Sequence, residues 1–193
     1  MSPVATLDDD TARAAVLEAA DAVFYRLGVA GAGMTEIRDE SGVSLRRLYT
    51  LYPSKRELVA AWLAARHETW LAWFTDAVER RRAGGEDAVR AAFGAIEEWS
   101  LTPGFRGCAF LNTAAEAGEI DDTHRAIIAS HKRDLTAVLA QLAAAAGSRE
   151  PDRLAESLAV LIDGAIVQSA VLGSSHPVAA ARRAAAHLLE ASR

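Results

Sequence analysis

The sequence predicts an all-α protein of about nine helices, three closely spaced at the front and six longer ones behind. Hydrophobic residues make up 51% of the 193 residues, Ala is prominent, and β-branched residues are sparse outside a few places. This composition favours helices and can supply a real core. Apolar residues recur at helical spacing along the chain, and Gly and Pro separate the periodic stretches.

The three front helices are bounded by residues that favour helix starts and stops. Thr35 and Ser44 can cap the second and third of them, because a side-chain oxygen can accept from the first free backbone N–H groups. Gly28 and Gly42 can end the first and second. The expected spans are about 11–27, 35–41 and 44–51.

The fourth helix is expected to start at Ser54, because Glu57 stands three residues later at capping-box spacing. It runs to about residue 82, where Gly84 and Gly85 interrupt the pattern. Five further helices follow, each between Gly- or Pro-containing breaks. Their expected spans are 86–100, 105–117, 122–146, 151–172 and 177–191.

Residues 42–58, of sequence GVSLRRLYTLYPSKREL, concentrate positive charge in an acidic chain. The protein has 21 Lys+Arg against 26 Asp+Glu, yet this segment holds four basic side chains and no acid before Glu57. Two short helices joined by a tight turn that contains Gly have the form of a helix-turn-helix. Helical steps of 100° place Leu45, Leu48 and Tyr52 toward the protein and Arg46, Arg47 and Thr50 outward.

The outward residues fit a duplex. Arg46 and Arg47 can bridge guanine O6 and N7 from a helix in the major groove. The N-terminus of the next helix, beside Lys55 and Arg56, can bind a phosphate, and Thr35 can do the same from the other side. An ordinary solvated helix face carries similar charges, so charge and spacing alone leave both interpretations open.

The stretch from about Ala15 to Leu63 resembles the DNA-binding domain of TetR-type (tetracycline-repressor-like) transcriptional regulators. The features that match in order and spacing are Ala19-Ala20, Phe24, Gly28, Thr35, Gly42-Val43-Ser44, Leu48-Tyr49 and Pro53-Ser54-Lys55. The resemblance implies a homodimeric regulator, usually a repressor, that binds a palindromic double-stranded DNA operator and is released by a small, largely apolar effector. It also implies a disordered arm at 1–10, a helix-turn-helix domain at 11–57 and an effector-binding and dimerisation domain at 58–193.

Carried over to this chain, the resemblance assigns two groups of DNA-binding residues. Those expected near phosphates are Thr35, Ser44, Tyr49 and Lys55. Those expected to read bases are Leu45, Arg46, Arg47 and Thr50. Leu45-Arg46-Arg47 stands where family members often have Lys-Gly-Thr, and Leu51 and Tyr52 replace a usual aromatic or His and a usual Phe. The operator therefore cannot be borrowed from a relative, and the two adjacent Arg point to guanine in the half-site.

The helix expected at 151–172 is apolar on most of its circumference, so its surface has to face both its own core and something else. A second subunit is the favoured partner, and Gly164, Ala165 and Ala170 allow a close approach between helices. We therefore expect self-association through about 151–172 and 177–191, with the two-fold symmetry that a palindrome requires.

An effector pocket is expected among helices four to eight, where aromatic residues and polar residues in apolar runs occur together. The candidate ligand-binding residues are Trp70, Phe74, Trp99, Phe110, Asn112, His131, Asp163 and Gln168. The alternative is that each is an ordinary core residue. Cys108, two residues from Arg106, is either a thiol sensitive to oxidants and electrophiles or a buried small hydrophobe.

Several classes of site and location are not indicated. A single cysteine cannot form an intramolecular disulfide or a Cys-rich zinc site, and the five His show no HExxH spacing, so no metal or cofactor is expected. There is no uninterrupted apolar run of about 18 residues, and the N-terminus lacks the pattern of a secretory signal. We expect a cytoplasmic protein without a membrane span.

Two other function classes stay open: a helical enzyme or small-molecule-binding protein without DNA binding, and an interaction module that kept the fold alone. Against an enzyme, the sequence has no nucleophile–base constellation, and GVAGAG at 28–33 lacks GxGxxG spacing and follows a helix rather than a strand. Against a pure interaction module, Arg46, Arg47, Tyr49 and Lys55 are all present.

Overall fold

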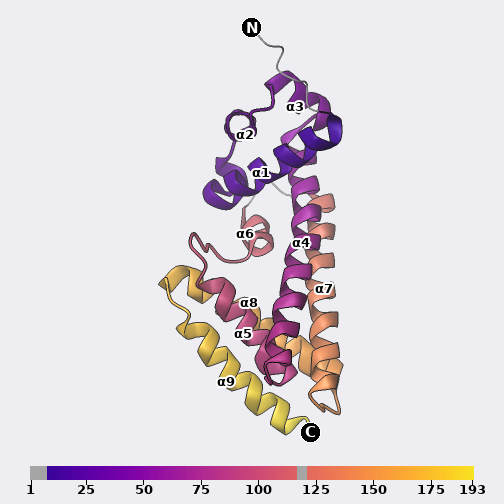
Figure 1. The fold of residues 1–193 in the computed structure, drawn as a ribbon, viewed down its shortest axis with the longest axis vertical. Helices are drawn as coiled ribbons and strands as arrows, with labels where there is room; N and C mark the ends of the chain where they lie inside the picture. The colour runs from indigo at the N-terminus through magenta and orange to yellow at the C-terminus, as the bar shows by residue number, and fades with distance from the viewer. Residues whose placement is uncertain (1–7, 117–120) are drawn as a thin grey trace. The chain divides into compact units, whose positions relative to one another are not determined.

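The computed structural model describes residues 8–116 and 121–193, and over these ranges the chain forms nine α-helices and no strand (Figure 1). The predicted all-α class is confirmed. In chain order the helices are α1 (Asp9–Gly31), α2 (Met34–Ser41), α3 (Leu45–Leu51), α4 (Lys55–Ala83), α5 (Ala88–Ser100), α6 (Ala109–Ala115), α7 (Asp122–Ala145), α8 (Pro151–Leu172) and α9 (His176–Ala191).

The helices divide into two compact units. Unit 1 comprises Met1–Arg66 and Asn112–Ile128, and unit 2 comprises His67–Leu111 and Ala129–Arg193. Helices α4, α6 and α7 therefore each contribute residues to both units. Unit 1 is discontinuous in sequence, because a segment from the middle of the chain packs with the N-terminal helices.

In unit 1, α1 packs against α2 and α3 through one apolar face. The ring centroids of Phe24 and Trp62 lie 5.1 Å apart, and this contact joins α1 to the start of α4. The indole N–H of Trp62 donates to Asp21 Oδ1 at 2.7 Å, and Arg66 forms an ion pair with the same carboxylate. A polar contact thus accompanies the apolar one, which satisfies the buried indole donor.

The helix ends from α2 to the start of α4 largely follow the predicted chemistry. Ser44 Oγ accepts from the Arg47 backbone N–H at 3.4 Å, and Ser54 Oγ accepts from the Glu57 N–H at 3.2 Å. Gly42 ends α2 with φ +67°. The prediction for Thr35 as a cap is wrong, because α2 begins one residue earlier at Met34 and Thr35 lies inside its first turn.

Two stretches of backbone differ from the prediction because of glycine. Gly28 has φ +78° and kinks α1 rather than ending it, and a further helical turn follows to Gly31. The helix expected at 105–117 begins only at Ala109. Gly104 and Gly107 have φ +77° and +86°, a left-handed conformation that cannot continue an α-helix. Residue 117 lies outside the described residues.

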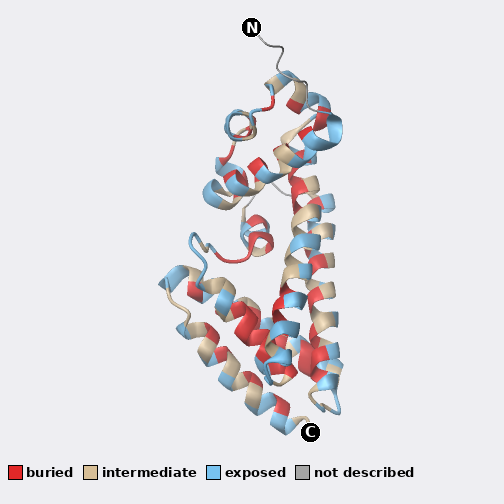
Figure 2. Ribbon diagram, viewed as in Figure 1, coloured by how far each residue is buried: buried red, intermediate tan, exposed pale blue. Residues whose placement is uncertain are grey.

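In unit 2, α5, α8 and α9 pack against one another, and Figure 2 shows the buried residues along them. The buried side of α8 carries Leu158, Ile162 and Ile166 among others. By length and hydropathy alone α8 could also cross a membrane. Such a helix is weak evidence for a span, because the core helix of a soluble protein meets the same criteria.

The φ of Gly42 leads to a prediction about stability. A residue with a Cβ in the left-handed region costs about 1–2 kcal/mol, and no atom lies within 4 Å of the added Cβ, so the cost is conformational rather than steric. We expect Gly42→Ala to lower the midpoint of thermal unfolding by about 2–8 °C for a chain of this size. Gly31→Ala is the matched control, since Gly31 is helical and its added Cβ makes only an ordinary 3.9 Å contact. Equal midpoints for the two variants would contradict this account.

Candidate nucleic-acid interface and ligand site

The orientation of α3 is fixed by two buried leucines. Leu48 and Leu51 are 0% and 5% exposed, and Tyr52 just after the helix is also buried. This burial leaves Arg46, Tyr49 and Thr50 on the exposed side of the helix. Helix α3 therefore presents a guanidinium, a phenol and a hydroxyl to solvent, as a recognition helix would to a major groove.

The other predicted DNA-binding residues lie in several environments within unit 1. Thr35 and Ser44 are exposed, although Ser44 Oγ already accepts the capping hydrogen bond. Leu45 and Lys55 are half-buried. Arg47 was predicted to face outward with Arg46, but its side chain is only 22% exposed and it pairs with Asp9 at 3.0 Å.

The N-terminal end of α4 lies beside a second part of unit 1 that the sequence analysis did not anticipate. His124 is fully buried, and its Nε2 lies 2.9 Å from the Arg56 carbonyl oxygen. A carbonyl can only accept, so Nε2–H donates, and Nδ1 accepts from the Asp121 N–H at 3.2 Å. The His124 backbone N–H lowers the pKa of Asp121 below its usual value, with the charge of Arg56, 3.0 Å away, acting in the same direction.

The carboxylate of Glu116, the residue after α6, binds the backbone of α1 just after its kink. Glu116 accepts from the backbone N–H groups of Val29, at 3.0 Å, and of Ala30. These amides follow the positive-φ Gly28, where the intrahelical hydrogen bonds are interrupted. Nothing local in the sequence marks the contacts of Glu116 with Val29 or of His124 with Arg56, because these partners are 87 and 68 residues away.

All of the predicted aromatic ligand residues come together in unit 2. Trp70 stacks on Phe74 with centroids 5.3 Å apart and planes 5° from parallel. It meets Trp99 and His131 edge-on at 5.5 and 5.4 Å. Phe110 stacks on His131 at 3.7 Å. We call these residues, Trp70, Phe74, Trp99, Phe110 and His131, the aromatic cluster.

The remaining predicted ligand residues contribute no ring to the aromatic cluster. Asp163 forms an ion pair with Lys132 at 2.6 Å, and Lys132 Nζ is also 3.9 Å from the sulfur of the buried Cys108. Gln168 is exposed on α8. Asn112 is exposed and belongs to unit 1.

One polar atom in the aromatic cluster lacks a hydrogen-bond partner. Trp70 Nε1 is buried, and no described residue accepts its proton. An unsatisfied buried N–H typically costs about 1–3 kcal/mol, so such a group calls for a water or a ligand acceptor. Beside it, Nδ1 of His131 lies 3.2 Å from Nδ1 of His67, so one imidazole donates to the other.

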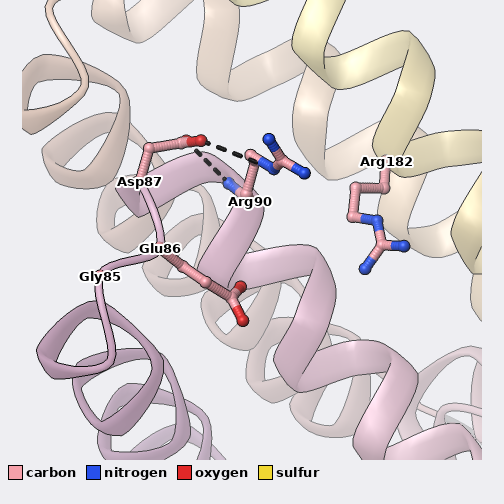
Figure 3. Close-up of a pocket in the computed structure, with 5 residues that line it drawn as sticks. All are labelled: Gly85, Glu86, Asp87, Arg90 and Arg182. Carbon is pink, nitrogen blue, oxygen red and sulfur yellow. Dashed lines mark hydrogen bonds and ion pairs between the residues drawn. The ribbon is translucent and has the colours of Figure 1, made fainter.

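A surface pocket of about 420 Å³ opens at the α4–α5 connection of unit 2 (Figure 3). It is lined by Gly85, Glu86, Asp87, Arg90 and Arg182. The Asp87 carboxylate accepts from the Arg90 backbone N–H at 3.0 Å, and Arg182 pairs with Glu97 at 3.0 Å. The pocket is lined by charged side chains that already have ion-pair partners, unlike the apolar sites that bind most small molecules.

Comparison with known proteins matches both parts of the chain to one family. The family model described as bacterial regulatory proteins, tetR family, matches residues 16–62, and that described as tetracyclin repressor-like, C-terminal domain, matches residues 85–185. The HTH-type transcriptional regulator TtgR of Pseudomonas putida is 40% identical over 57 residues, which cover 30% of this chain and 27% of that protein. The similarity to this curated relative therefore spans well under half of its length.

Solved structures are similar over nearly the whole chain. A TetR-family transcriptional regulator from Streptomyces coelicolor has a TM-score of 0.81 and 26% identity, covering 95% of this chain and 96% of its own. A putative TetR transcriptional regulator from Streptomyces avermitilis has a TM-score of 0.77 and 29% identity, with 94% and 97% covered.

Proposed function

Because the chain belongs to the TetR family of transcriptional regulators, we propose that it acts in the cytoplasm as a homodimeric repressor that binds a palindromic operator and leaves it when an effector binds. The observation that carries this proposal is the exposed face of α3. In a chain of net charge −5, the buried Leu48 and Leu51 hold α3 so that Arg46 and Thr50 face solvent.

The proposed DNA contacts are of two kinds, to base edges and to phosphates. Arg46 is the principal base reader, because a guanidinium can form two hydrogen bonds to guanine in the major groove. Thr35, Tyr49 and Lys55 contact phosphates, which fix the register without choosing the sequence. Two copies of α3, one from each subunit, then read half-sites about one helical turn apart or a multiple of it.

We expect selection from a random duplex library, at a stated salt concentration, to recover a palindrome with guanine at the position that Arg46 contacts. Arg46→Ala should then lose about 5- to 150-fold in discrimination at that position, the value of one bidentate pair. Arg90→Ala, which removes an equally charged exposed side chain from α5, should leave both affinity and preference unchanged. An equal loss on all sequences for Arg46→Ala would instead make Arg46 a phosphate contact.

Self-association is proposed through the exposed face of α8. Val160, Val167 and Val171 are 73%, 45% and 78% exposed, and at spacings of seven and four residues they share one side of the helix with Gly164. We call these four residues the α8 stripe. Exposed apolar residues in a row favour a protein partner, and a two-fold axis along the α8 stripe lets the same residues meet on both subunits.

Replacing a valine of the α8 stripe by a charge should separate the subunits. Val171→Asp would place an unpaired carboxylate at the interface, so we expect sedimentation equilibrium to give a dimer dissociation constant at least about tenfold higher. Leu101→Asp is the control, because Leu101 is 67% exposed but lies outside α8. A Val171→Asp variant that stays as dimeric as the control would place the interface elsewhere. Circular dichroism of both variants checks that the fold persists.

The effector is proposed to bind at the aromatic cluster. Stacked and edge-on rings favour planar aromatic compounds, and the unpaired Trp70 Nε1–H favours one that carries a hydrogen-bond acceptor. Binding releases DNA only if it favours a conformation in which the two α3 helices no longer match the half-site spacing. Helix α4 contributes both Lys55 at its start and Trp70 farther along, which makes it a candidate lever.

The proposed effector class can be tested with two probes of similar shape, naphthalene and 2-acetylnaphthalene, followed by tryptophan fluorescence. We expect Trp70→Phe to weaken 2-acetylnaphthalene by about 2- to 10-fold, the value of one neutral hydrogen bond, and to leave naphthalene nearly unchanged. Trp73→Phe is the matched control, since Trp73 also contacts Trp70 and Trp99. Failure of both probes to bind wild-type protein would remove the aromatic cluster as an effector site while leaving DNA binding intact.

A further inference from the structure

The two adjacent arginines of α3 lie in different environments. Arg47 Nη2 donates to Asp9 Oδ1 at 3.0 Å, a contact between residues 38 positions apart at the start of α1 and in α3. The Arg47 side chain is 22% exposed, whereas Arg46 is exposed and pairs with no described side chain. Although the sequence presents a tandem Arg-Arg, only Arg46 extends fully into solvent.

Asp9 belongs to a run of three acids whose members also differ. Asp8 is the N-cap of α1, and its carboxylate accepts from the Thr11 N–H at 2.8 Å, a contact that lowers the pKa of Asp8. Asp9 pairs with Arg47, and Asp10 is exposed with no partner among the described residues. The pairing of Asp9 is therefore specific to its position and is not shared by the neighbouring acids.

We propose that Asp9 is a specificity-determining residue: it restrains and neutralises Arg47, so that Arg46 supplies the guanine contact and Arg47 makes no independent one. This inference rests on the proposed function. A guanidinium already bonded to a carboxylate offers fewer free donors to a base edge. The carboxylate also places negative charge beside the helix that enters the groove, which opposes the approach of phosphates.

The ion pair between Asp9 and Arg47 restrains Arg47 only weakly. Asp9 is 77% exposed, and ion pairs in such surroundings are weak and screened by salt. DNA can therefore displace Asp9 at a modest loss of affinity, and the loss should shrink as salt rises. Removing Asp9 should withdraw this restraint and leave the Arg47 guanidinium with more donors for DNA.

The test compares Asp9→Ala with Asp10→Ala, each in the wild-type and the Arg47→Ala background, on the full-length protein and its selected operator. Both substitutions remove one acid from the first turn of α1, so general electrostatics and the helix dipole affect them alike. We expect Asp9→Ala to raise operator affinity about two- to fivefold more than Asp10→Ala at low salt. We expect this excess to vanish in the Arg47→Ala background. Selection with Asp9→Ala should show a stronger preference at one base pair adjacent to the Arg46 contact.

Two results would overturn the proposal. The first is an equal effect of Asp9→Ala and Asp10→Ala in both backgrounds, which would make Asp9 an ordinary surface charge. The second is a larger loss of discrimination for Arg47→Ala than for Arg46→Ala in the otherwise wild-type protein. If wild-type protein selects no sequence, the proposed function itself fails. A double-mutant cycle on unfolding then still reports whether the Asp9–Arg47 pair exists, so the two failures can be told apart.

Discussion

The DNA-binding unit depends on two polar contacts made by a segment from the middle of the chain. The Glu116 carboxylate accepts from the Val29 and Ala30 amides, and the His124 ring bonds the Arg56 carbonyl. The amides need this partner because Gly28 interrupts the hydrogen-bond ladder of α1 and leaves them without intrahelical acceptors. A carboxylate on such amides is a favourable pairing of charge with a helix start. The segment is therefore a structural part of unit 1.

This arrangement bears on how an effector could influence DNA. Residues 112–128 belong to unit 1, but α6 and α7 continue from them into unit 2, as α4 does. The proposal above names α4 alone as a candidate lever. Because Glu116 and His124 bind backbone atoms at the end of α1 and the start of α4, a displacement of either side chain would strain those two helix ends. Coupling of this kind requires a contact whose energy differs between two states.

Local chemistry explains which parts of the fold could be predicted. Caps such as Ser44 and stops such as Gly42 involve partners within a few residues, so their spacing carries the information. The prediction that a helix starts at residue 105 was wrong. It relied on the spacing of apolar residues and gave no weight to Gly107, whose positive φ prevents a helix from starting before it. The grouping of the aromatic residues could be predicted, because they are concentrated in one part of the sequence. The exposure of Gln168 could not, because a polar residue in an apolar helix can face a cavity or solvent. The Asp9–Arg47 and Glu116 contacts join distant residues, and no pattern within a helix predicts them.

The remaining question about α8 is what covers its outer face. The helix has the length and hydropathy of a membrane span, but Leu158, Ile162 and Ile166 are buried within unit 2, where α5 and α9 pack against α8. Lipid could not surround α8 without dismantling that core, since every one of those contacts would have to be lost. The second copy of the chain that we propose would cover the α8 stripe without disturbing the core. It would also supply a second α3, and one short recognition helix contacts too few base pairs to specify an operator alone. The apolar outer face of α8 and the need for two reading helices thus lead to the same assembly.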